Sequence, residues 1–70
     1  MINAVVITVS DRCARGKQKD ESGPAVVELL RGIGASVVAA EVVSDDLEPL
    51  AGKLRDYANR ADVNLILTTG

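Results

Sequence analysis

The sequence predicts an α/β domain built around a parallel sheet, and two observations carry this prediction. Three short apolar runs rich in β-branched residues recur along the chain, and none of them has the spacing of a helix face. Between successive runs lie two stretches in which apolar residues do recur at helical spacing. Strand, helix, strand, helix, strand in this order is a βαβαβ unit, for which parallel strands and right-handed crossovers are expected.

The first strand is expected over residues 2–10, INAVVITVS, because a β-branched run without polar alternation is typical of a strand buried on both faces. Residues 11–21, DRCARGKQKDE, follow with many charges, a glycine and no apolar period, which indicates a surface loop. This loop exceeds the roughly two to six residues usual between a strand and a helix. Long ordered loops in compact domains are often functional, so the segment is a candidate part of a site.

The first helix is expected over residues 22–33. Ser22 offers an N-cap oxygen, and Pro24 falls in the first turn, where its missing N–H leaves no hydrogen bond unmade. Gly34 can adopt the left-handed conformation that closes a helix. The apolar face at helical spacing consists of Val26, Leu29, Leu30 and Ile33.

The next strand and helix repeat this pattern. Residues 35–43, ASVVAAEVV, have the strand signature. The polar run SDD at 44–46 then starts a helix, with Asp45 as its N-cap and Glu48 completing a capping box. The apolar face expected for this second helix consists of Leu47, Leu50, Ala51, Leu54, Ala58 and Ala61.

A third buried strand is expected over residues 63–69, VNLILTT, and two strand orders are compatible with the whole unit. The order 1-2-3 places both helices on one face of the sheet. The order 2-1-3 places them on opposite faces, with the first strand in the middle. We favour 2-1-3, because all three strands are apolar on both sides.

The 2-1-3 order also predicts where a ligand binds. The chain changes direction between the first and third strands, so the loops beyond their carboxyl ends diverge around a crevice, which is where open α/β sheets bind ligands. Residues 10–12 then face residues 68–70. Asp45 and Asp46 leave the second strand at the same edge of the sheet.

Composition argues against several other functions. The formal charge is −2 and the eight Lys and Arg are scattered, unlike the basic stripe of a protein that binds duplex nucleic acid. No apolar run is long enough for a membrane span and no cleavable leader precedes the first strand, so a soluble cytoplasmic protein is expected. Cys13 is the only cysteine and histidine is absent, so a divalent metal would need oxygen ligands.

Four segments together resemble one protein family. They are TVSDR at 8–12, DESGP at 20–24, VVSDD at 42–46 and LILTTG at 65–70. In this order and spacing they resemble the MogA/MoaB family of molybdenum cofactor biosynthesis proteins, which includes molybdopterin adenylyltransferases and the corresponding domain of gephyrin. The segments span the whole chain, so residues 1–70 are expected to be the N-terminal part of a single domain of this kind.

The resemblance implies a three-layer α/β/α fold, a trimeric assembly, and transfer of AMP from Mg-ATP to the terminal phosphate of molybdopterin. Family members continue beyond the TTG at 68–70 with further glycines, helices and strands. The resemblance therefore also implies that this chain carries only part of the site and is inactive without the rest.

The resemblance further assigns roles to single residues. Asp45 matches the family's acidic residue after the second strand and is the catalytic candidate, since a carboxylate there can hold Mg²⁺ against phosphates. An N-cap role for Asp45 can coexist with this one. Ser44 departs from the proline that many relatives have, and serine caps a helix equally well. The substrate-binding candidates are Ser10, Asp11, Thr68, Thr69 and Gly70.

Two other functions stay open beside the adenylyltransferase. Related domains in molybdenum insertion proteins and CinA-like proteins share the pattern from the first strand to TTG. A non-catalytic MoaB-like protein, which binds molybdopterin or only oligomerises, is the alternative from a different class. Binding of molybdopterin without formation of an AMP adduct from ATP would identify that alternative.

Overall fold

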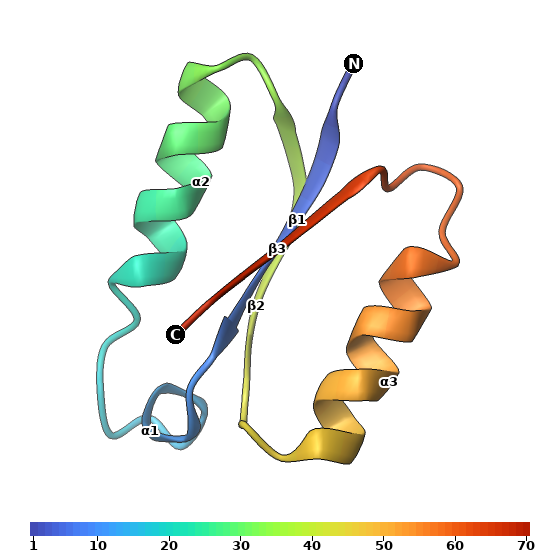
Figure 1. The fold of residues 1–70 in the computed structure, drawn as a ribbon. Coiled ribbons are helices and arrows are strands. Elements are labelled where there is room, and N and C mark those ends of the chain that lie inside the picture. The colour runs from blue at the N-terminus through green and yellow to red at the C-terminus, as the bar shows by residue number, and fades with distance from the viewer.

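A parallel three-stranded sheet lies in the middle of the molecule, and the computed structural model describes all 70 residues around it. The strands are β1 (Asn3–Val9), β2 (Ser36–Val43) and β3 (Leu65–Thr69). Their order is β2-β1-β3, with β1 paired in parallel to both neighbours, which confirms the predicted order 2-1-3. Two helices, α2 (Ser22–Gly32) and α3 (Leu47–Ala58), lie on opposite sides of the sheet and complete the three layers (Figure 1).

β1 supplies the core of both layers. Its residues 4–8 are at most 2% exposed. Successive side chains of a strand point to opposite faces of its sheet. Ala4 and Val6 accordingly pack on the α2 side. Val5 and Ile7 pack on the α3 side. This double burial is why β1 has an apolar run without polar alternation.

The carboxyl end of α2 closes as the sequence predicts. Gly34 has a φ of 85°, in the left-handed region. The N–H of Ala35 donates to the Leu30 carbonyl oxygen at 3.0 Å, and that of Gly34 donates to the Arg31 carbonyl oxygen at 3.1 Å. This pair of bonds is a Schellman motif, so Gly34 satisfies carbonyl groups that the end of the helix would otherwise leave unpaired.

The face of α2 that packs on the sheet differs from the predicted one. Leu30 is buried, and Val26 and Val27 pack beside it. Leu29 and Ile33, which the predicted face included, are each 69% exposed. The prediction is wrong at these two positions because the helix is rotated about its axis relative to the predicted orientation. Val27 therefore faces the strands, whereas Leu29 and Ile33 face away from them.

The predicted surface loop contains a one-turn helix, α1 (Asp11–Ala14). Ser10 caps it, because its Oγ accepts a hydrogen bond from the Cys13 backbone N–H at 3.3 Å. Asp11 places a negative charge in this turn and pairs with Arg15 at 3.3 Å. The expectation of a loop throughout is wrong here because α1 buries no side chain and therefore leaves no apolar period in the sequence.

The start of α3 also differs from the predicted capping box. The N-cap is Asp46, and its side chain makes no capping hydrogen bond. Ser44 Oγ donates instead to Asp46 Oδ2 at 3.2 Å, which holds that carboxylate back toward β2. The box between Asp45 and Glu48 is wrong because the helix begins one residue later than expected, which moves the cap position from Asp45 to Asp46.

α3 contacts the sheet along a narrow strip. Leu50, Leu54 and Tyr57 are half-buried and pack against the cluster of Val5, Ile7 and Val43. They recur at the i, i+4, i+7 spacing of one helix face. The prediction is wrong at the other positions of that face: Leu47, Ala51 and Ala58 flank this strip and are exposed, and Ala61 is exposed and lies beyond the end of α3. Neither α2 nor α3 has the length and apolar composition needed to cross a membrane.

Candidate functional site

The strands end together at one edge of the sheet, where the sequence analysis locates the candidate site. The Ser10 N–H donates to the Val43 carbonyl oxygen at 2.9 Å and so joins the ends of β1 and β2. On the other side of β1, Gly70 lies so close that an added Cβ would be 2.6 Å from the Val9 carbonyl oxygen. Only glycine fits such an approach of two backbones.

A polar hollow of about 220 Å³ opens at this edge, between the end of β1 and the segment that leads to α2. Ser10 and Gly70 both line it, so the ends of the first and third strands meet in one cavity. Cys13, Lys19 and Asp20 are among its other lining residues. A hydroxyl, a cation, a carboxylate and a glycine backbone are groups that can orient a polar ligand by directed hydrogen bonds.

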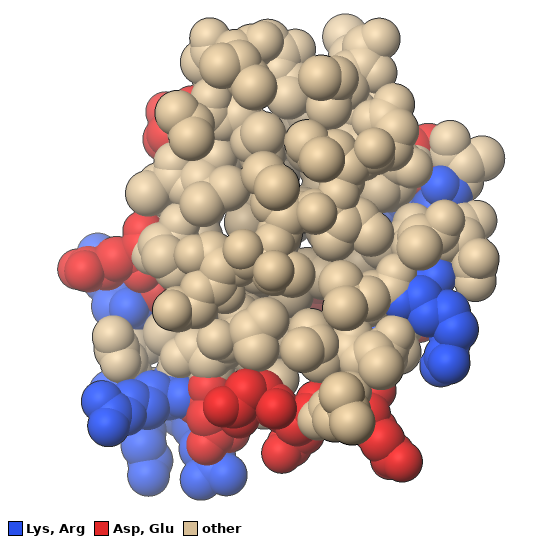
Figure 2. Space-filling view, viewed as in Figure 1, with Lys and Arg blue, Asp and Glu red and all other residues tan.

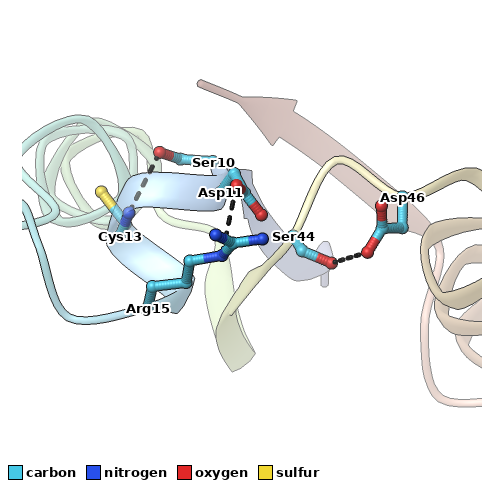
Figure 3. Close-up of polar contacts among 6 residues, drawn as sticks. All are labelled: Ser10, Asp11, Cys13, Arg15, Ser44 and Asp46. Atoms are coloured by element: carbon cyan, nitrogen blue, oxygen red, sulfur yellow. Dashed lines mark hydrogen bonds and ion pairs between the residues drawn. The ribbon is translucent and has the colours of Figure 1, made fainter.

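Three other substrate-binding candidates lie near the hollow but do not line it. Thr69 is half-buried and pairs in register with Thr8 of β1, whereas Thr68 is exposed. The Asp11 carboxylate is turned toward the Arg15 guanidinium, with which it forms its ion pair (Figure 3). The structure therefore brings Ser10 and Gly70 together and leaves these three at the margin.

Asp45 lies at the same edge but beyond the neighbouring strand. It follows the last residue of β2 by two positions, is exposed, and its side chain makes no hydrogen bond or ion pair. The adjacent Asp46 carboxylate is held by Ser44, as Figure 3 shows. No group of three or more His, Cys, Asp or Glu residues gathers to enclose a metal ion. Mg²⁺ is commonly held by one or two carboxylates together with substrate phosphates, and the free carboxylate of Asp45 fits that donor set.

Charges of opposite sign divide this edge of the molecule. Figure 2 shows basic side chains gathered at the lower left, below α1 and its loop, and acidic side chains beside them along the bottom. The exposed cations of that segment are Arg12, Arg15, Lys17 and Lys19. The exposed acids around the start of α3 are Asp45, Asp46 and Glu48. A phosphate group is attracted to the first set and a divalent cation to the second.

Asp20 is a residue of this edge that sequence reasoning missed. Its Oδ1 accepts from the Gly23 N–H at 3.0 Å, whereas neither Ser22 nor the N-cap residue Glu21 makes a capping bond with its side chain. The predicted cap at Ser22 is wrong because α2 already begins at Ser22, so the cap position falls on Glu21 and the bond to the first turn comes from Asp20. Asp20 Oδ2 also accepts from the Thr8 hydroxyl at 3.0 Å. The spacing Asp-x-x-Gly was the available signal, since a capping side chain bonds the amide two or three residues further on.

The resolved pKa shifts belong to the other side of the sheet. The hydrogen bond and charge of Glu41 raise the pKa of Lys53. The hydrogen bond from Arg60 lowers the pKa of Asp62, and the same bond raises the pKa of Arg60. The Lys53–Glu41 pair joins α3 to β2, whereas Arg60 and Asp62 pair with each other in the segment just after α3.

The part of the chain that contains the four motif segments matches a known protein family. Residues 5–70 match the family model described as "Probable molybdopterin binding domain". The chain belongs to this family. Its sequence is similar to the molybdopterin adenylyltransferase of Pyrococcus furiosus, with 40% identity over 65 residues, covering 93% of this chain and 37% of that protein. It is 33% identical over 69 residues to the molybdenum cofactor biosynthesis protein B of Bacillus anthracis, covering 99% of this chain and 40% of that protein.

A solved structure supports the same relationship. The crystal structure of the molybdopterin biosynthesis enzyme MoaB from Thermus thermophilus superposes with a TM-score of 0.92 at 37% identity. The match covers 100% of this chain and 44% of that one. The predicted fold class and the predicted family are thus confirmed. The chain spans less than half the length of each of these relatives.

Proposed function

We propose that the chain is the N-terminal part of a single molybdopterin adenylyltransferase domain, which serves molybdenum cofactor biosynthesis in the cytoplasm and assembles as a trimer. The family match and the 40% identity to an enzyme of that name support the activity. The observation that carries the proposal is the meeting of Ser10 and Gly70 in one polar hollow. A basic segment borders that hollow, and the free carboxylate of Asp45 follows β2 at the same edge of the sheet.

The proposed reaction joins AMP to molybdopterin. An oxygen of the terminal phosphate of molybdopterin attacks the α-phosphorus of ATP. The new P–O bond forms as the bond from the α-phosphorus to the oxygen bridging to the β-phosphate breaks, and pyrophosphate leaves with that oxygen. Such a transfer needs no protein nucleophile, so its rate depends on orienting the reactants and neutralising their charge.

The residues of this chain bind and orient the two substrates. Ser10 and the Gly70 backbone hold the phosphate end of molybdopterin in the hollow, and Lys19 adds positive charge beside it. The hollow is small, which limits it to the phosphate end of the substrate. The other candidates extend the contact at the strand ends: Asp11, Thr68 and Thr69.

Asp45 is the residue that would hold Mg²⁺. Its carboxylate is exposed and unpaired, so nothing in the chain must be displaced when a cation binds. Mg²⁺ supplies neutralisation of the charge on the ATP phosphates. Asp45 in turn fixes where along the edge the nucleotide lies, because its backbone is attached to β2 and through Val43 to Ser10.

The first prediction tests Asp45 in the full-length protein. Asp45→Asn should lower adenylyl transfer by about 100-fold or more, since one charge contact to a developing charge is worth that much in an active site. Folding should be unaffected, because the side chain makes no contact that the change would remove. Formation of adenylylated molybdopterin from Mg-ATP, followed by chromatography, measures the rate.

Asp46→Asn is the matched control for this experiment. It removes the same charge one residue away, and asparagine can still accept the Ser44 hydrogen bond. Its rate should stay within a few-fold of the wild type. Equal loss in both variants would mean that only the general field of the acidic end matters, and unchanged turnover of Asp45→Asn would remove Asp45 from the catalytic role.

A non-catalytic molybdopterin-binding protein is the second candidate. The 33% identity to a relative named molybdenum cofactor biosynthesis protein B, a name that states no activity, leaves room for it. Both candidates use the hollow at Ser10 and Gly70, but only the enzyme consumes ATP. Binding of molybdopterin by the full-length protein without release of pyrophosphate from Mg-ATP would favour this candidate.

A further inference from the structure

The carboxylate of Asp20 bridges the central strand and the first turn of α2. Thr8 is 2% exposed, and its hydroxyl donates to Asp20 Oδ2 at 3.0 Å. The other oxygen, Oδ1, accepts from the Gly23 N–H at 3.0 Å. Both oxygens of one loop residue are therefore engaged by residues of two different elements. We call Thr8, Asp20 and Gly23 the Asp20 latch.

Gly23 shows how tightly the latch is assembled. A Cβ added at Gly23 would lie 2.5 Å from Thr8 Oγ1 and would collide with the Asp20 carboxylate as well. Thr8 is a β-branched residue buried in a strand, so its hydroxyl has little freedom to move aside. The start of α2 is thus held against β1 at a distance that only glycine permits.

The latch closes the segment that borders the polar hollow. We call residues 10–19 the site segment, because Ser10, Cys13 and Lys19 of this segment line that hollow. Apart from the Ser10 N–H bond to Val43, every hydrogen bond and ion pair within the site segment has both partners inside it. α1 rests beside the end of β2. The Asp20 latch is therefore the only polar attachment at the carboxyl end of the segment.

Asp20 also stands between two cavities. Thr8 and Asp20 line the polar hollow and a larger hollow of about 310 Å³, whose other walls include Val27 of α2 and Val42 of β2. If the carboxylate turned away, the polar hollow would lose its inner wall and open toward apolar surface. The latch consequently sets the shape of the hollow in addition to capping a helix.

We propose that Thr8 and Asp20 are positioning residues, which hold the site segment in its binding conformation before the ligand arrives. This inference rests on the proposed function, because the ligand it concerns is the phosphate end of molybdopterin. A segment that is already ordered in the free protein loses little conformational entropy when the ligand binds. The affinity for the ligand is therefore higher. Neither residue needs to touch the reacting atoms.

Three variants separate positioning from simple helix capping. Thr8→Val removes the hydroxyl but keeps the shape of the side chain and leaves the bond from Gly23 to Asp20 intact. Asp20→Asn keeps both bonds, since its amide oxygen can accept from the Gly23 N–H and its NH₂ can donate to Thr8 Oγ1. Asp20→Ala removes both. Tyr57→Phe is the matched control, because it removes a hydroxyl–carboxylate bond on the opposite face of the sheet.

The first readout needs no substrate. Cys13 is half-buried in the site segment and lines the hollow, so the rate at which N-ethylmaleimide labels it reports opening of the segment. Labelling of the full-length protein would be followed by peptide mass spectrometry. Thr8→Val should speed labelling by about 10-fold, the change that loss of one buried hydrogen bond allows, and Asp20→Ala, which loses both bonds, should speed it at least as much. Asp20→Asn and Tyr57→Phe should label like the wild type.

The second readout is steady-state adenylyl transfer. Thr8→Val should raise the KM for molybdopterin by about 10-fold and change kcat less. In this variant part of the binding free energy is used to order the site segment. If the wild-type protein transfers no AMP, the proposed activity fails, and labelling of Cys13 together with direct binding of molybdopterin still tests the latch. The positioning role would be overturned if Cys13 of Thr8→Val were labelled at the wild-type rate. It would also be overturned if Cys13 of Asp20→Asn were labelled as fast as that of Asp20→Ala.

Discussion

α2 and α3 are each tied to the sheet by a hydroxyl that donates to a carboxylate, but the two bonds have different surroundings. On the α2 side, Thr8 is 2% exposed and donates to Asp20. On the α3 side, Tyr57 donates to Glu41 of β2, which also pairs with Lys53 at 2.9 Å. The Lys53 and Glu41 side chains are 46% and 29% exposed, so water competes for their contacts. A hydrogen bond from a hydroxyl to a carboxylate can thus fix a loop on the α2 face and contribute little to stability on the α3 face.

Packing follows the same asymmetry. α2 inserts Leu30, which is 4% exposed, into the cluster with Ala4 and Val6. α3 has no fully buried residue and relies on half-buried side chains such as Leu50 and Leu54. One face of the sheet is therefore closed by a deep contact near the amino ends of β1 and β2, and the other by a shallow strip. Equivalent mutations should therefore change the free energy of unfolding more on the α2 face than on the α3 face.

The largest effect is expected from truncating the deep contact. Leu30→Ala in the full-length protein should lower the free energy of unfolding by about 2–5 kcal/mol, because the change leaves a cavity in a well-packed cluster. Leu54→Ala is the matched truncation on the α3 side and should cost clearly less, since water already reaches that side chain. Urea denaturation measures both. Equal losses would mean that the two helices contribute alike and would remove the asymmetry.

The next comparison uses one substitution in two helices. Gly23→Ala should destabilise the protein by about 1–3 kcal/mol, because a Cβ collides with the Asp20 latch. Gly52→Ala in α3 should instead stabilise it by roughly 0.5–1 kcal/mol, since a Cβ there meets nothing closer than Arg55 Nη2 at 3.9 Å. Thermal unfolding of both variants gives the signs. A stabilising Gly23→Ala would show that α2 can move away from Thr8 freely.

Much of the fold could be predicted because burial leaves a pattern in the sequence. The continuous apolar run of β1 reflects burial on both faces, and that run favoured the strand order found in the structure. The strand order in turn predicts that Ser10 and Gly70 lie together, since parallel strands end at one edge. The end of α2 was predictable because Gly34 satisfies a local rule of backbone conformation.

Other features had no pattern to reveal them. α1 buries no side chain, so nothing periodic distinguishes it from a loop. The rotation of α2 that exposes Leu29 and Ile33 depends on how the helix meets the sheet, which is decided by tertiary packing. The bond between Thr8 and Asp20 joins a residue that looks like any strand threonine to an acid in an aperiodic loop. Such a contact exists only once the fold has brought the two together.

The smallest effect concerns the exposed bond on the α3 side and its dependence on pH. The hydrogen bond and charge of Glu41 raise the pKa of Lys53 above its ordinary value of 10.5. A group whose pKa is raised by folding contributes stability that is fully present below its unfolded pKa. That contribution is lost as the pH rises through the higher pKa of the folded state. The stability gained from the Glu41–Lys53 pair should therefore persist at neutral pH and disappear only in strongly alkaline solution.

Glu41→Gln tests this by removing the charge while keeping the size and shape of the side chain. Tyrosine side chains in general ionise near pH ~10, so both proteins should carry Tyr57→Phe to keep a tyrosine titration out of the measurement. The difference in unfolding free energy between the two should be small and constant from neutral pH to about pH 10, and should shrink toward zero above it. It should also shrink in 1 M salt, because the pair is exposed and screened there. A large difference that ignores both pH and salt would mean that Glu41 anchors α3 as firmly as Asp20 anchors α2, and the contrast between the two faces would fail.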